Sequence, residues 1–173
     1  MTVPGAIDVI AELSTTSGML VGAGTVLDAA TARRCIDAGA EFLVSPVLDS
    51  QILTLAHREG RLVMAGGLTP VEVVDAWNNG ADFVKVFPCG NLGGAAYLRT
   101  LKTVLPHIEM IPTGGVTLAN AASFFEAGAA AVGIGGELVS MAALLAGDFT
   151  AIEEGARRFA AVARGVKYDN ALS

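Results

Sequence analysis

Short apolar runs recur along the chain about 22 residues apart, and polar side chains do not alternate within them. Unbroken apolar runs of this length are typical of parallel strands that are covered on both faces. The pattern predicts six such strands, at residues 19–22, 42–45, 62–65, 83–87, 110–112 and 131–134.

The segments between these runs carry helix start and stop signals at a constant spacing. Asp and Thr side chains cap helix N-termini, and glycine adopts the left-handed conformation that ends many helices. Four such residues are each followed 11 positions later by a glycine, in the pairs Asp28 and Gly39, Asp49 and Gly60, Thr69 and Gly80, and Thr117 and Gly128. The sequence therefore predicts helices of about ten residues. Further helices are predicted over 4–13 and 148–163.

Alternating strands and helices predict an α/β fold, which either closes into a barrel or stays open as a doubly wound sheet. The segment Gly22-Ala-Gly24-Thr25-Val26-Leu27 lacks the third glycine of a dinucleotide-binding fingerprint, which argues against the open sheet. The near-constant unit length and the glycines and threonines after the strands favour a TIM (β/α)8 barrel. Because six strands are counted, we expect residues 1–173 to form a single, incomplete barrel domain that lacks the first two strands.

Composition narrows the class of protein further. Of 173 residues, 53% are hydrophobic and 16% charged, with a mean hydropathy of +0.57, as in a folded domain. The net charge of -6 without a basic cluster argues against nucleic acid as a partner. No apolar run approaches the roughly 18 residues of a membrane span, and the start lacks a basic segment before an apolar one.

The two cysteines, Cys35 and Cys89, show neither a metal-ligand spacing nor a disulfide framework. No metal site is therefore predicted. A reduced cytoplasm is the simplest compartment.

Lys85 is the lysine, of three in the chain, that falls within a predicted strand, in phase with Phe83 and Phe87. Burying an ammonium group is costly unless it is paired or loses its proton. A lysine with a lowered pKa is the nucleophile that forms a Schiff base with a ketone. The alternative is that the strand ends early and the ammonium reaches solvent or a partner such as Asp82.

Glycine pairs follow the last two predicted strands, as Gly114-Gly115 and Gly135-Gly136. Such pairs can present backbone N–H groups to an anion. They are also common simply as tight turns between a strand and a helix.

Other polar side chains near the strand ends have ordinary structural explanations beside functional ones. Thr25 and Thr113 could bind a substrate hydroxyl or carboxylate, or could cap helices. His57 and His107 fall at the opposite ends of the strands, where surface roles are expected. Cys89 is expected to be a small core residue.

Several of these segments, in this order and spacing, resemble the 2-keto-3-deoxy-6-phosphogluconate (KDPG) and 4-hydroxy-2-oxoglutarate (KHG) aldolases. The segments are Gly22-Ala-Gly24-Thr25-Val26, Ser45-Pro46, Phe83-Val-Lys85-Val-Phe87-Pro88, Pro112-Thr113-Gly114-Gly115-Val116 and Gly133-Ile-Gly135-Gly136. The resemblance implies a cofactor-independent, class I aldolase of Entner–Doudoroff carbohydrate metabolism, usually a homotrimer. Such an enzyme cleaves a 2-keto acid to pyruvate and an aldehyde, glyceraldehyde 3-phosphate or glyoxylate.

The same resemblance implies roles for individual residues. Lys85 would be the Schiff-base lysine, and Thr113 would lie near the pyruvyl carboxylate. The pyruvyl pocket would be lined by Thr25, Pro46 and Phe87. The distal phosphate or carboxylate would be held by Gly114, Gly115, Gly135 and Gly136.

The sequence departs from the family pattern at two points. The family's acid/base glutamate and a substrate-binding arginine belong to a segment that the resemblance places before Met1, so we expect an N-terminally truncated chain. Neither Glu41 nor Glu72 is a substitute, because the first begins a strand and the second caps a helix. Glu137 stands where a small hydroxyl residue is frequent in the family. An acid beside an anion site would weaken the site unless its side chain points away.

Two other functions fit parts of the pattern. A phosphate-binding barrel isomerase or synthase would use the same glycine pairs. An inactive oligomeric scaffold would follow from an incomplete barrel, whose uncovered strand edges favour pairing with another chain. For the same reason, we expect an oligomer or a protein of low stability.

Overall fold

The computed structural model describes the backbone of residues 3–169 and the side chains of residues 3–165. The chain divides into two compact units, Met1–Lys85 and Val86–Ser173. The strands are parallel and follow one another in the order β1-β2-β3-β4-β5. No helix of the described residues is long and apolar enough to cross a membrane.

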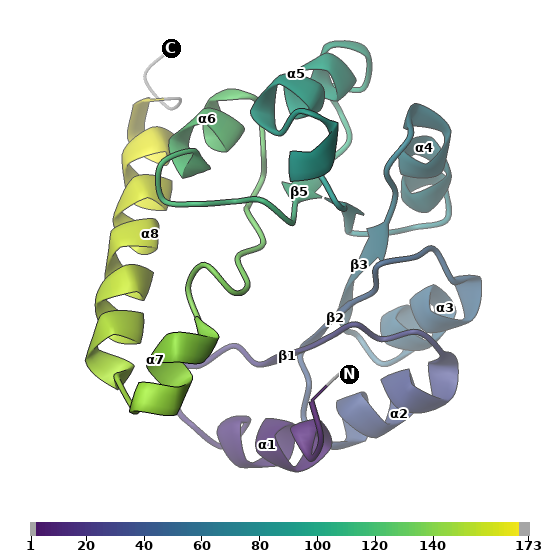
Figure 1. Ribbon diagram of the computed structural model, residues 1–173. Helices are drawn as coiled ribbons and strands as arrows, with labels where there is room; N and C mark the ends of the chain where they lie inside the picture. Colours follow the sequence, from purple (N-terminus) through teal and green to yellow (C-terminus); the bar gives the residue numbers. More distant parts are fainter. Residues whose placement is uncertain (1–2, 170–173) are drawn as a thin grey trace. The chain divides into compact units, whose positions relative to one another are not determined.

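Strands and helices alternate regularly in the first unit (Figure 1). Its elements are α1 (Ala6–Leu13), β1 (Gly22–Gly24), α2 (Ala29–Asp37), β2 (Phe42–Val44), α3 (Ser50–Arg58), β3 (Leu62–Gly66), α4 (Pro70–Asn78) and β4 (Phe83–Val86), whose last residue begins the second unit. The predicted strands at 42–45, 62–65 and 83–87 are confirmed. The strand predicted at 19–22 begins three residues later, because Met19 and Leu20 are exposed.

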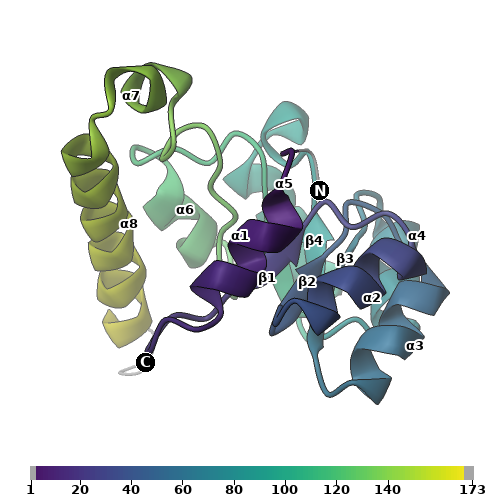
Figure 2. The same ribbon diagram turned by 90° about the horizontal axis from the view of Figure 1, so that it is seen from below.

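The two faces of this sheet differ in burial. Helices α2, α3 and α4 lie on the same side of the strands (Figure 2). The strand residues that face them are almost fully buried, namely Ala23, Leu43, Val63, Ala65 and Val84. Phe83 and Lys85, which alternate with Val84, are only partly buried. The helix-covered face therefore holds the core of this unit, and the other face stays accessible.

Three of the four helix N-caps predicted from the sequence are confirmed, at Asp28, Asp49 and Thr69. Asp28 accepts a hydrogen bond from the Thr31 N–H at 2.7 Å, and Asp49 accepts one from the Gln51 N–H at 2.8 Å. Thr69 and Glu72 form the reciprocal capping box. These helices begin where the sequence predicts.

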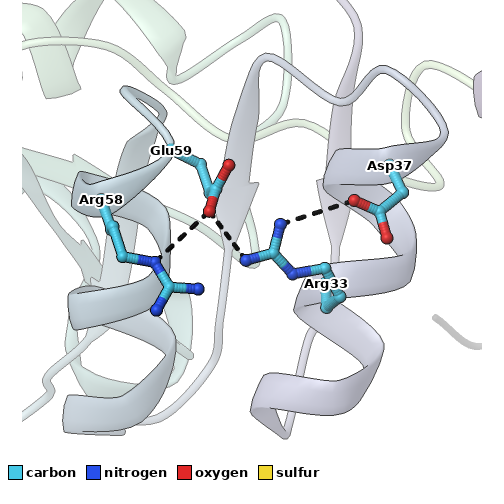
Figure 3. Close-up of polar contacts among 4 residues, drawn as sticks. All are labelled: Arg33, Asp37, Arg58 and Glu59. Carbon is cyan, nitrogen blue, oxygen red and sulfur yellow. Dashed lines mark hydrogen bonds and ion pairs between the residues drawn. The ribbon is translucent and has the colours of Figure 1, made fainter.

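A small ion-pair network joins α2 to the end of α3 (Figure 3). Arg33 lies 2.8 Å from Glu59 and 3.5 Å from Asp37, and Arg58 lies 3.4 Å from Glu59. The hydrogen bond from Arg33 lowers the pKa of Glu59. Pairs this exposed contribute little to stability, so packing of the buried faces holds the unit together.

The second unit has less strand and more helix. Its elements are a short 3-10 helix (Gly90–Leu92), α5 (Ala95–Val104), β5 (Met110–Pro112), α6 (Ala121–Glu126), α7 (Met141–Ala146) and α8 (Phe149–Asp169). The three residues of β5 are buried. After β5, the Thr113 N–H donates to the Val86 carbonyl at 2.9 Å. Helix α6 packs against α8.

Two sequence predictions in this unit need correction. Residues 131–134 do not form a strand, because Gly133 alone makes an isolated parallel bridge, to Thr113. The described residues therefore hold five strands rather than six. The N-cap of α6 is Asn120 rather than Thr117; the Asn120 side chain makes no capping hydrogen bond, and its Oδ1 accepts the Thr117 N–H at 2.8 Å within the turn before the helix.

Position 66 has no room for a side chain, because the backbone of Pro46 lies against it, so a substitution there tests the packing of β3. A Cβ at Gly66 would overlap the backbone of Pro46, whereas a Cβ at Gly24 would meet nothing within 4 Å. We expect Gly66→Ala to lower the free energy of unfolding by about 3 kcal/mol and Gly24→Ala to change it by less than about 1 kcal/mol. Urea unfolding of both variants measures this, and equal losses would contradict the packing described.

Candidate functional site

The carboxyl ends of β2, β3 and β4 are held together by main-chain hydrogen bonds. The Gly66 N–H donates to the Val47 carbonyl at 3.2 Å, and the Gly67 N–H donates to the Lys85 carbonyl at 3.0 Å. Gly66 is also in register with Lys85. The predicted site residues Pro46 and Lys85 therefore flank the end of β3 on neighbouring strands.

Thr25 follows β1 in an unusual backbone conformation. Its φ of 59° makes it the one non-glycine residue of the described chain in the left-handed region. A β-branched residue there costs on the order of 1–3 kcal/mol, and such strain is concentrated at binding and catalytic sites. The resemblance read from the sequence predicts Thr25 as a residue of the substrate pocket.

Lys85 lies on the accessible face of β4, while its neighbours Val84 and Val86 are fully buried. Burial lowers the pKa of its ammonium below the ordinary value. Lys102, in contrast, donates from Nζ to the carbonyls of Pro106 at 3.1 Å and Ile108 at 2.9 Å. Burial of Lys85 thus disfavours its charged form relative to an exposed lysine, and Lys102 acts as a structural donor. Lys167 lies outside the described side chains.

The carboxylate of Asp82, named as an alternative partner of Lys85, is used at the other end of the strand. It accepts the Val63 N–H at 2.7 Å and lies 3.4 Å from His57 Nε2. These contacts fix the start of β3 beside the start of β4. They also agree with the surface role expected of His57.

The second unit contains a hollow of about 370 Å³ that brings together six of the predicted site residues. Its lining comprises Phe87, Thr113, Gly114, Gly115, Val116, Thr117, Gly133, Gly135, Gly136 and Glu137. Both glycine pairs predicted to bind an anion therefore face one space, together with Phe87 and Thr113.

The backbone around Gly114 and Gly115 requires glycine. Both residues have positive φ, 83° and 77°, and a Cβ on Gly115 would lie 2.9 Å from the Gly90 Cα. The Gly114 carbonyl accepts the Gly90 N–H at 2.9 Å. Because carbonyl and N–H point in opposite directions across a trans peptide, the Gly115 N–H points away from Gly90.

Thr113 is fixed by its neighbours on both sides. Its carbonyl accepts the Cys89 N–H at 3.0 Å, and its Oγ1 donates weakly to the Ile111 carbonyl at 3.4 Å. A Cβ on Gly133 would overlap the Thr113 side chain, so glycine at 133 makes room for it. The threonine is therefore held in one place at the edge of the hollow.

Cys89 and Glu72, which the sequence does not favour as catalytic groups, have structural roles. Cys89 lies in the core, and Glu72 caps a helix. Cys89 is buried, and burial raises the pKa of its thiol to about 11. Glu72 accepts the Thr69 N–H at 2.8 Å, and this hydrogen bond lowers its pKa. Among the described residues, no three His, Cys, Asp or Glu side chains gather as metal ligands would.

Comparison with known proteins gives a consistent set of relatives. The family model described as KDPG and KHG aldolase matches residues 1–155. The chain is 36% identical over 120 residues to a 2-dehydro-3-deoxy-6-phosphogalactonate aldolase of Escherichia coli, covering 69% of this chain and 58% of that protein. It is 32% identical over 123 residues to a 2-dehydro-3-deoxy-phosphogluconate aldolase of Zymomonas mobilis, covering 71% and 59%. The chain thus spans less than two thirds of the length of these relatives.

Solved structures agree with the sequence relatives. The native KDPGal structure has a TM-score of 0.84 at 28% identity and covers 95% of this chain and 79% of its own. KDPG aldolase of Legionella pneumophila, with pyruvate captured as a covalent carbinolamine, has a TM-score of 0.80 at 27% identity, covering 94% and 78%. A 3-hexulose-6-phosphate synthase of Salmonella typhimurium, at 17% identity and TM-score 0.70 with coverage of 90% and 79%, shares the fold alone.

The lowered pKa of Lys85 predicts a pH-dependent effect of its replacement. Below this pKa the folded protein holds a desolvated ammonium, so we expect Lys85→Met to raise the melting temperature near pH 7. The gain should shrink as the pH rises toward 10.5, because Lys85 then loses its proton in the folded state first. Melting temperatures across this range measure the trend. Lys102→Met should lower stability throughout, and a gain for Lys85→Met that is independent of pH would contradict the assignment.

Proposed function

The chain belongs to the KDPG and KHG aldolase family, and from this premise we propose that it acts as a class I aldolase. Its substrate is a 2-keto acid of the type of KDPG or 4-hydroxy-2-oxoglutarate. The products are pyruvate and an aldehyde, glyceraldehyde 3-phosphate or glyoxylate. The observation that carries the proposal is Lys85, a lysine with a lowered pKa at the carboxyl end of a parallel strand.

The reaction begins with addition of the Lys85 amine to the keto carbon of the substrate. Loss of water from the resulting carbinolamine gives a protonated imine. Only the neutral amine is a nucleophile, so the desolvation that lowers its pKa increases the reactive fraction at neutral pH. The carbinolamine captured in the Legionella relative supports this step.

The imine then accepts the electrons of the broken carbon–carbon bond. As the C4 hydroxyl loses its proton, the C3–C4 pair moves toward the imine nitrogen, and the aldehyde leaves. The enamine takes a proton at C3, and hydrolysis returns Lys85 and releases pyruvate. This chemistry needs no cofactor. We assign the general acid/base role to no residue of this chain.

The remaining site residues bind the substrate in this proposal. Thr113 binds the pyruvyl carboxylate, and Gly114, Gly115, Gly135 and Gly136 bind the distal group. The pyruvyl pocket is lined by Thr25, Pro46 and Phe87. Two observations support these roles: Phe87, Thr113 and the four glycines line one hollow, and Pro46 and Lys85 flank the end of β3.

We further infer that residues 1–173 form one domain with a fold of the (β/α)8-barrel type. The sequential order of parallel strands supports a barrel. The cytoplasm is the proposed compartment.

We infer that the chain works as a homo-oligomer, a trimer by resemblance to the family. Several large apolar side chains of the second unit are exposed, which supports self-association. They lie on and beside α7, and the most exposed are Met141, Leu145 and Phe149, at 69%, 83% and 69%. One structural neighbour, at TM-score 0.86, is a designed cage made by fusing symmetric oligomeric domains.

Pyruvate release from KDPG or 4-hydroxy-2-oxoglutarate tests the catalytic proposal. We expect the full chain to release pyruvate, Lys85→Met to lose this activity by at least about 10³-fold, and Lys102→Met to keep it if folded. A coupled assay with lactate dehydrogenase measures the rate. Release that survives Lys85→Met would exclude Schiff-base chemistry at this residue, and a folded but inactive chain would favour the scaffold function.

Sedimentation velocity tests the oligomer. We expect the wild-type chain to sediment as an oligomer and the double variant Leu145→Asp/Phe149→Asp to dissociate, because charges on both side chains oppose their burial. Val71→Asp, at an equally exposed apolar position on α4, is the control and should assemble normally. A wild-type monomer would overturn this part of the proposal.

A further inference from the structure

We propose that the distal part of the substrate site selects a neutral, hydroxyl-bearing group over a phosphate or a carboxylate, and that Glu137 determines this preference. The inference rests on the proposed function, because it concerns the same site and specifies the substrate. It follows from what surrounds the glycine pairs in the hollow of the second unit.

The charge of the hollow is set by one side chain. Of the ten described residues that line it, Glu137 alone carries an ionisable group, and no lining residue is Lys, Arg or His. The other polar side chains of the lining are the hydroxyls of Thr113 and Thr117. A ligand at the glycine pairs therefore has an exposed acidic residue, and no Lys, Arg or His, among the residues that line this wall.

The backbone keeps Glu137 beside the glycines. The N–H groups of Leu138 and Val139 both donate to the Gly135 carbonyl, at 2.9 and 3.1 Å. These bonds close a turn around Gly136 and Glu137. Glu137, which is exposed, therefore belongs to the same turn as Gly135 and Gly136.

The nearest helix offers little to offset this negative charge. Helix α7 has only six residues, and its N-cap, Ser140, accepts the Ala143 N–H at 3.1 Å. Its first donors are thus partly used within the helix. The hollow contains backbone donors, two hydroxyls and one anionic acceptor.

Hydrogen-bonding capacity distinguishes the possible ligands. A phosphate dianion or a carboxylate only accepts hydrogen bonds, so it pairs with glycine N–H groups but faces Glu137 as a like charge. A hydroxyl group accepts from a glycine N–H and donates to the Glu137 carboxylate at the same time. The set of groups in this hollow therefore matches the neutral end of an unphosphorylated 2-keto-3-deoxy sugar acid.

The variant Glu137→Gln tests this selection, because it removes the charge and retains a carbonyl acceptor. Glu126→Gln is the matched control, since Glu126 is an exposed acid at the end of α6 outside the lining. We measure kcat/KM for 2-keto-3-deoxygluconate and for its 6-phosphate with the full-length wild-type chain and both variants. In parallel, inorganic phosphate is titrated while the amide resonances of the four glycines are followed.

We expect the wild-type chain to prefer the unphosphorylated acid. Glu137→Gln should shift the ratio of kcat/KM toward the phosphorylated acid at least tenfold and raise phosphate affinity to a similar extent, while Glu126→Gln should change neither. A wild-type preference for the phosphorylated acid that Glu137→Gln leaves unchanged would overturn the inference. So would equal phosphate affinity of wild type and Glu137→Gln, including no measurable binding by either. If no protein cleaves either acid, the proposed aldolase function fails, and the phosphate titration still decides the role of Glu137.

Discussion

Partial burial of the Lys85 amine is the constraint on which the proposed chemistry depends. Lys85 alternates along β4 with two fully buried valines, so the strand that packs the core also fixes where the amine emerges. Burial lowers the pKa of the amine. One local arrangement therefore fixes the position of this amine and lowers its pKa, as the proposed nucleophile requires, whereas Lys102 donates to two carbonyls.

Close approach of neighbouring main chains organises the rest of the site. Gly66 has no room for a Cβ beside Pro46, and Gly133 has none beside Thr113. At both positions the absence of a side chain lets a predicted site residue lie next to the glycine backbone. Thr25 is a third predicted site residue with an unusual local geometry. Its left-handed φ is unfavourable for a β-branched residue, and such strain is concentrated at functional sites.

The parts of the fold that the sequence predicts correctly depend on interactions between residues that are close together in the chain. Asp28, Asp49 and Thr69 cap helices because their side chains reach the nearest backbone N–H groups, a relation contained in a few consecutive residues. Thr117 does not cap a helix, because residues 118–120 form a turn and α6 begins at Ala121 with Asn120 as its N-cap. Residues 131–134 look like a strand but pair at one residue only, since strand formation depends on a partner elsewhere in the chain. The sequence names Lys85, Thr25 and the two glycine pairs as candidate site residues. It does not predict the left-handed backbone of Thr25 or that both glycine pairs face one hollow, because these depend on contacts between distant segments.

The central claim is that Lys85 forms an imine with a 2-keto acid, and trapping the imine tests it most directly. The wild-type chain is treated with pyruvate and sodium borohydride, digested and analysed by mass spectrometry. The account predicts a reduced pyruvyl adduct on Lys85 and none on Lys102. An adduct on Lys102, or an unmodified Lys85 in the folded protein, would contradict it.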